Sequence, residues 1–65
     1  MAISLAAARV NAELSQADVC KALKMSKTTL SNYENYITSP DIERAQKLAE
    51  LYGCEVGDIR WTSEA

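Results

Sequence analysis

Residues 15–35 read SQADVCKALKMSKTTLSNYEN and contain two short helical patterns in succession. Three residues, Lys24–Ser26, separate the patterns. A serine, Ser15 or Ser26, stands directly before each pattern, and its hydroxyl can cap the free amides of the first helical turn. Asp18 follows Ser15 by three residues, as in a capping box. Two helices of eight or nine residues with so short a connection are typical of a helix-turn-helix, although other helical hairpins share this spacing.

The flanking sequence also favours helices. Ser4 can cap a helix that ends at Asn11, and Asp41 can cap another that ends at Gly53. The apolar residues of the second helix recur at helical spacing: Ile42, Ala45, Leu48, Ala49 and Tyr52. A last helical turn is predicted at Val56–Arg60, and no alternating pattern predicts a strand. We therefore expect one compact all-α domain of five helices over residues 1–65.

The run from Leu14 to Asn35 closely resembles the Cro/repressor (Xre-type) helix-turn-helix family, as does the pattern from Pro40 to Ile59. The resemblance covers roughly residues 3–61. It implies a lambda-repressor-like DNA-binding domain in which helices 2 and 3, about residues 15–35, form the helix-turn-helix. In such a fold the second of these helices enters the major groove of DNA.

The resemblance also implies which side chains contact DNA. The predicted base readers lie on the exposed face of helix 3: Lys27, Thr28, Ser31 and Asn32. Of these, positions 27, 28 and 32 match the usual base readers of the family. Lysine can reach guanine acceptors, asparagine can pair with adenine, and the threonine methyl can contact thymine. The backbone contacts would be Gln16, Ser26, Thr29, Asn35, Tyr36 and Thr38. Gln16 stands first in helix 2, where free amides and the helix dipole attract a phosphate. The alternative for each is an ordinary solvated polar side chain.

Other matched positions are implied to be structural. Arg9 and Glu34 match a pair that ties helix 1 to helix 3 as a partly buried ion pair, which would remove Arg9 from the DNA-binding charges. The family usually has glycine where this chain has Glu13, Lys24 and Tyr36. A non-glycine residue with a positive φ costs about 1 kcal/mol. Either these turns are shaped differently, or the domain loses some stability there.

The composition excludes several classes of protein. Cys20 and Cys54, with no histidine in the chain, provide neither a usual zinc spacing nor a Ser–His or Cys–His catalytic pair. We therefore expect no enzyme activity, metal, cofactor or small-molecule ligand. The chain has no apolar run of membrane-spanning length and no recognisable signal peptide. These features predict a protein of the bacterial cytoplasm with reduced thiols.

The net charge of −2 is unusual for a nucleic-acid binder. Most acidic residues follow Pro40, however, whereas residues 14–39 carry three lysines and two acids. With so few basic side chains, one subunit should bind DNA weakly, and a homodimer on a palindromic site would double the contacts. The predicted dimer surface consists of apolar residues near the C-terminus: Val56, Ile59 and Trp61. In the alternative, Trp61 is a lid on the core of its own subunit.

These observations predict a sequence-specific transcriptional regulator that binds double-stranded DNA. We expect a phage or prophage repressor, or a Cro-like protein, bound as a dimer to a palindromic operator. The chain could be a whole Cro-like regulator or the DNA-binding domain of a longer repressor. The alternative function is a protein-interaction module of antirepressor type, which the acidic charge favours. The polar face of helix 3 argues against it, because interaction surfaces usually carry aromatic or aliphatic anchors.

Overall fold

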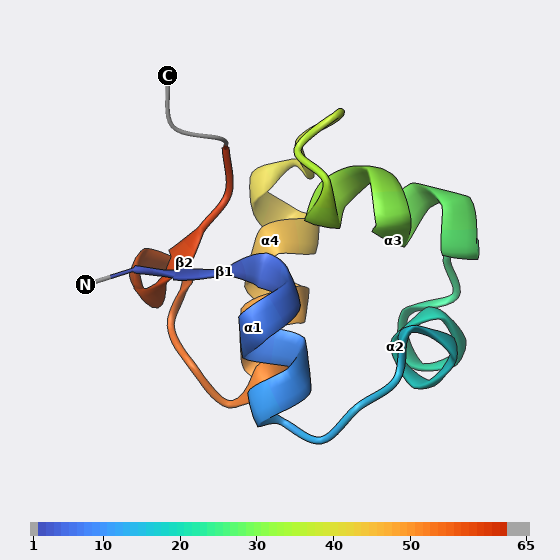
Figure 1. The fold of residues 1–65 in the computed structure, drawn as a ribbon, viewed down its shortest axis with the longest axis horizontal. Helices are drawn as coiled ribbons and strands as arrows, with labels where there is room; N and C mark the ends of the chain where they lie inside the picture. The colour runs from blue at the N-terminus through green and yellow to red at the C-terminus, as the bar shows by residue number, and fades with distance from the viewer. Residues whose placement is uncertain (1, 63–65) are drawn as a thin grey trace.

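Over residues 2–62, the chain folds into four α-helices, one 3₁₀ helix and two very short strands (Figure 1). The computed structural model describes residues 2–62. In chain order the elements are β1 (Ile3–Ser4), α1 (Leu5–Asn11), α2 (Gln16–Leu23), α3 (Lys27–Glu34), α4 (Ile42–Tyr52), the 3₁₀ helix η1 (Val56–Asp58) and β2 (Ile59–Arg60). In Figure 1, α2 and α3 lie on the side of α1 and α4 opposite to the strands. None of the helices within residues 2–62 is long and apolar enough to cross a membrane.

Each α-helix begins at the capping side chain that the sequence predicts. The amide of the third helical residue donates a hydrogen bond to the side chain of Ser4, Ser15, Ser26 or Asp41, over 2.8–3.1 Å. The predicted capping box is also present, because the Asp18 carboxylate accepts from the backbone N–H of Ser15 at 3.0 Å. This backbone hydrogen bond holds the pKa of Asp18 below its usual value.

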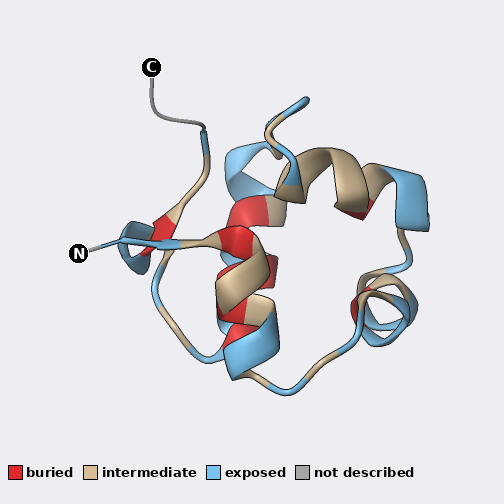
Figure 2. Ribbon diagram, viewed as in Figure 1, coloured by how far each residue is buried: buried red, intermediate tan, exposed pale blue. Residues whose placement is uncertain are grey.

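The core receives one fully buried side chain from every α-helix: Leu5, Val19, Leu30 and Leu48. Four further residues complete the buried cluster: Ala8, Ala49, Tyr52 and Ile59. Figure 2 shows that the buried positions gather on α1 and α4, in the middle of the fold. The predicted stripe of α4 is confirmed except at Ile42, which is 67% exposed in the first turn.

The mostly helical helix-turn-helix fold agrees with the prediction, but the count of five helices is wrong. The predicted last turn, Val56–Arg60, divides into the three-residue η1 and the strand β2. Gly57 has a low helix propensity, and the amides of Asp58 and Ile59 donate back only three residues. β2 instead pairs in parallel with β1, and the register places Ile59 opposite Ile3. The sequence pattern did not predict this pairing, which joins the two ends of the described chain.

All three positions where the family usually has glycine adopt left-handed backbone. The φ angles are +60° at Glu13, +54° at Lys24 and +60° at Tyr36. The turns therefore keep the shape that glycine would allow, and each non-glycine residue carries a conformational penalty of about 1 kcal/mol. Gly53, with a φ of +74°, ends α4 in the same conformation without this penalty.

Replacing Lys24 with glycine should stabilise the domain. The change relieves the left-handed strain, partly offset by the greater freedom of glycine in the unfolded chain, so we expect a gain of up to about 1 kcal/mol. Urea unfolding followed by circular dichroism measures it. Lys21→Gly is the matched control, because the same substitution inside α2 should lose about 1 kcal/mol. A loss of stability in both variants would show that Lys24 carries no strain.

Candidate nucleic-acid interface

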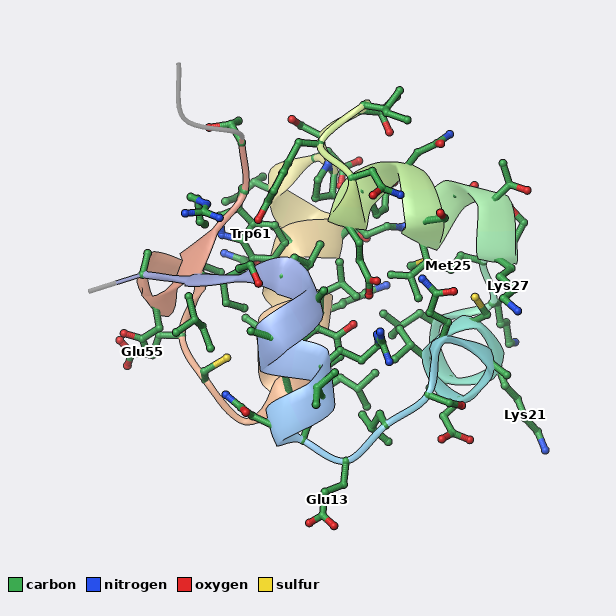
Figure 3. The ribbon with its side chains drawn as sticks, viewed as in Figure 1. Glu13, Lys21, Met25, Lys27, Glu55 and Trp61 are labelled. Carbon is green, nitrogen blue, oxygen red and sulfur yellow. The ribbon has the colours of Figure 1, made fainter. Side chains whose placement is uncertain are left out.

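The predicted base readers lie together on one face of α3. Four of its side chains and one from the start of α2 line a shallow hollow of about 320 Å³: Lys27, Thr28, Ser31, Asn32 and Gln16. Lys27 and Thr28, in the first turn of α3, are exposed, whereas Ser31 and Asn32 are half-buried. Figure 3 shows Lys27 at the end of α3 nearest to α2, with its side chain directed away from α1 and α4. This surface is polar and carries the positive charge of Lys27.

The turn between α2 and α3 sets the angle at which α3 leaves the core. Lys24 adopts the left-handed conformation at the end of α2, and the next amide, of Met25, donates back to the Cys20 carbonyl at 3.0 Å. The chain then enters α3 at Ser26, whose hydroxyl also lies 2.8 Å from the Thr29 hydroxyl. The hydroxyls of the predicted backbone contacts Ser26 and Thr29 are therefore hydrogen-bonded to each other.

The structure brings Arg9 of α1 and Glu34 of α3 together as an ion pair. The distance from Arg9 Nε to Glu34 Oε2 is 2.7 Å, and the two side chains are 16% and 7% exposed. Arg9 Nη1 also donates to the Leu14 carbonyl at 2.9 Å, which fixes the chain between α1 and α2. Because Arg9 neutralises Glu34, the acidic side chain adds little negative field beside α3.

Gln16 is bound to this ion pair. Its amide nitrogen donates to Glu34 Oε1 at 3.0 Å, so the first residue of α2 is attached to the last residue of α3. The hydrogen bond orients the Gln16 side chain beside the hollow that it lines with the base-reading candidates. The sequence did not predict this contact, because it depends on how α2 and α3 pack.

The remaining backbone-contact candidates follow the end of α3. Asn35 is exposed at the helix C-terminus, Thr38 is exposed in the following loop, and Tyr36 between them is half-buried. The guanidinium of Arg60 lies over the Tyr36 ring, 5.7 Å from its centroid. Arg60 belongs to the part of the sequence after Pro40, where most acidic residues lie, but in the fold β2 pairs with β1 and Arg60 lies next to this loop. Arg60 therefore adds a positive charge that the sequence pattern did not assign to this surface.

The predicted dimer residues are mostly engaged in their own subunit. Ile59 is 3% exposed and belongs to the core, so its side chain offers no surface to a partner, which corrects that prediction. Val56 and Trp61 are half-buried and pack against the core. The indole N–H of Trp61 donates to the Val56 carbonyl at 2.9 Å, an arrangement consistent with a lid (Figure 3).

The other reactive groups lie away from the hollow. Cys20 and Cys54 are free thiols, and burial together with the nearby Asp58 raises the pKa of Cys54. Burial also raises the pKa of Tyr52, with a smaller contribution from Glu34. Within residues 2–62, no three His, Cys, Asp or Glu side chains are grouped so that they could hold a metal ion.

Comparison with known proteins adds two similarities. The sequence model of the family described as Helix-turn-helix matches residues 5–59. The chain is also 34% identical, over 56 residues, to the cryptic phage CTXphi transcriptional repressor RstR of Vibrio cholerae. That alignment covers 86% of this chain and 50% of the relative, so the chain spans about half the length of the relative. No solved structure matches the chain.

Removing the charge of Glu34 should destabilise the domain strongly. Glu34→Gln leaves the Arg9 guanidinium, 16% exposed, without its counter-ion, and we expect a loss of about 3 kcal/mol in the free energy of unfolding. The matched control is Glu43→Gln, because Glu43 pairs with Lys47 at 3.6 Å on an open surface. That variant should change stability by less than about 0.5 kcal/mol. Equal losses for the two variants would contradict a structural role for the Arg9–Glu34 pair.

Proposed function

Since the chain belongs to the Xre-type helix-turn-helix family, we propose that it is a transcriptional regulator that binds a specific double-stranded DNA sequence. The observation that carries this proposal is the polar hollow beside α3, where Gln16 meets the four base-reading candidates. Among residues 2–62, no aliphatic or aromatic side chain lines this hollow, whereas surfaces that bind proteins usually centre on such anchors. Hydrogen-bonding side chains on an exposed helix suit the base edges of a major groove.

In the proposed complex, α3 lies in the major groove. Lys27 reaches guanine acceptors, Asn32 pairs with adenine, and the Thr28 methyl contacts thymine. The first turn of α2 meets a phosphate through its free amides, aided by Gln16. The remaining hydrogen of the Gln16 amide is available for this contact while the other is bound to Glu34.

The charges near the proposed interface predict weak binding by one subunit. Lys21, Lys24 and Lys27 lie on α2, its turn and α3, and Arg60 lies beside the following loop. Because so few cations can reach phosphates, we propose that two subunits bind together to a palindromic operator. Val56 and Trp61 remain the proposed contact residues of such a dimer, with the lid as their alternative. Without a second subunit, one subunit would bind its half-site with a modest affinity.

The similarity to a phage repressor supports a phage or prophage origin for this regulator, acting in the bacterial cytoplasm as a repressor or Cro-like protein. We propose that it needs neither a cofactor nor a small-molecule ligand for DNA binding. The second candidate is a protein-interaction module, which the acidic net charge of −2 supports. Selection of bound DNA from a random pool separates the two. A palindromic consensus would support the regulator, and a lack of any enrichment would favour the interaction module.

Replacing Asn32 with alanine should weaken binding to the selected site by about 1–3 kcal/mol and relax the preference at one base pair. The reason is the loss of a side chain that both donates to and accepts from a base. Fluorescence anisotropy with the selected duplex and its single-base variants measures the change. Asn11→Ala, at the exposed end of α1, is the matched control and should bind as the unchanged protein does. Equal losses for specific and random DNA would show that Asn32 reads no base.

Replacing Gln16 with alanine should weaken binding to all sequences alike, because the residue is proposed to contact a phosphate. The same anisotropy titrations, with selected and scrambled duplexes, give the ratio of the two affinities. Gln46→Ala, on the exposed side of α4, is the matched glutamine control. A changed base preference in the Gln16 variant would show that Gln16 contacts a base and not a phosphate.

A further inference from the structure

Asn35 turns its side-chain amide toward its own helix. The nitrogen Nδ2 lies 2.9 Å from the Ser31 carbonyl oxygen and 3.2 Å from the Ser31 hydroxyl oxygen. The backbone N–H of Asn35 also donates to the Ser31 carbonyl, at 2.9 Å. The donors that a phosphate contact would need are thus directed at Ser31. This arrangement gives Asn35 a different task from the backbone contact that the family resemblance implies.

The contact biases the direction of hydrogen bonding at Ser31. An amide nitrogen only donates, so the Ser31 hydroxyl oxygen must be the acceptor of the 3.2 Å bond. The hydroxyl hydrogen then points away from Asn35, and one of the two lone pairs of the oxygen remains free. Because accepting the bond from Asn35 polarises the hydroxyl, its hydrogen becomes a better donor and its remaining lone pair a weaker acceptor toward a base. Because Ser31 lines the hollow beside α3, this hydrogen can point toward the proposed base-reading surface.

We propose that Asn35 is a positioning residue that makes Ser31 a hydrogen-bond donor toward a DNA base. This inference rests on the proposed function, since it concerns how the same surface distinguishes bases. In the major groove, guanine, adenine and thymine each present at least one acceptor, whereas cytosine presents only its N4 donor. As a stronger donor than acceptor, Ser31 therefore disfavours cytosine at the position that it faces.

The neighbouring asparagine differs in this respect. Within residues 2–62, no intramolecular hydrogen bond engages the Asn32 side chain, although the Asn32 carbonyl accepts from the amides of Ile37 and Thr38. Asn32 can therefore offer both a donor and an acceptor to one base, as pairing with adenine requires. Two asparagines three residues apart on one chain segment thus have separate tasks: Asn32 contacts a base, and Asn35 orients the group that contacts another.

The test is selection of DNA from a random pool by the unchanged protein and by two Asn35 variants. The unchanged protein should disfavour cytosine at one position by about three- to tenfold, the range expected for one hydrogen bond. Asn35→Ala removes the bond that polarises the Ser31 hydroxyl and frees its second lone pair, and should reduce this discrimination to less than about twofold. Asn35→Asp places an acceptor beside Ser31, so the hydroxyl turns toward the carboxylate and its lone pair faces the base. The preference should then shift toward cytosine or adenine.

Three further variants make the result specific. Ser31→Ala should remove the preference at the same base pair, and adding Asn35→Ala to it should cause no further change at that position. Asn11→Ala should leave the selected consensus unchanged. Thermal unfolding of each variant, measured beside the selection, identifies any that lose affinity by failing to fold, and preferences are compared only as ratios between sequences.

A measurement without DNA tests the contact itself. In amide proton–nitrogen correlation spectra, the Asn35 side-chain resonances should move when Ser31 is replaced by alanine, whereas those of Asn11 should not. If they do not move, the contact is absent and the inference is overturned, whatever DNA the protein selects. If the unchanged protein selects a consensus that Asn35→Ala and Asn35→Asp also select, the inference is overturned while the proposed function stands. If it selects no sequence at all, both are overturned.

Discussion

The ion pair between Arg9 and Glu34 is the contact on which the placement of α3 depends. Glu34 is the last residue of α3 and is 7% exposed, so its charge is tolerated only where a cation meets it. Arg9 supplies that cation and also binds the Leu14 carbonyl, while Gln16 binds the second carboxylate oxygen. One carboxylate therefore connects α1, the start of α2 and the end of α3. A buried pair adds little net stability over apolar packing, and here its main consequence is a single orientation for α3.

The turns that follow α1, α2 and α3 also keep a fixed geometry, although their backbone is strained. Left-handed residues follow α1, α2 and α3 at Glu13, Lys24 and Tyr36, without the glycine that would relieve each of them. Neighbouring contacts hold the strained turns in place. Arg9 binds the carbonyl next to Glu13, the Met25 amide closes the turn at Lys24, and Arg60 covers the Tyr36 ring. The orientation of the polar face of α3 is thus determined at both of its ends.

Local signals in the sequence were sufficient to predict the helices. Ser4, Ser15, Ser26 and Asp41 each cap a helix because a short side-chain oxygen and the amide three residues later interact within one turn. The last turn was mispredicted because Val56 and Ile59 fit both a helical and an extended pattern over so few residues. The deciding factor is the pairing of Ile59 with Ile3, a contact across almost the whole chain.

In the candidate site, too, the sequence predicts some features and not others. The polar face of α3 follows from helical periodicity, and the Arg9–Glu34 pair was anticipated from family resemblance. The groups that Gln16, Asn35 and Arg60 contact were not anticipated, because each contact depends on a side-chain orientation that tertiary packing selects. Periodicity places a side chain on a face, but it does not say which of its atoms is already hydrogen-bonded within the domain.

These internal bonds affect how a domain with an acidic net charge binds DNA. Arg9 neutralises Glu34, so part of the cationic charge serves the fold and few cations remain for phosphates. Affinity for random DNA depends mainly on such cations, whereas discrimination between sequences depends on hydrogen bonds at the base edges. A hydroxyl or amide whose donor direction is set before binding loses less conformational freedom when it meets a base, and it rejects a base of the wrong polarity. A low cationic charge combined with preset hydrogen-bond directions therefore favours a regulator with little attraction to random DNA and a high ratio of specific to non-specific binding.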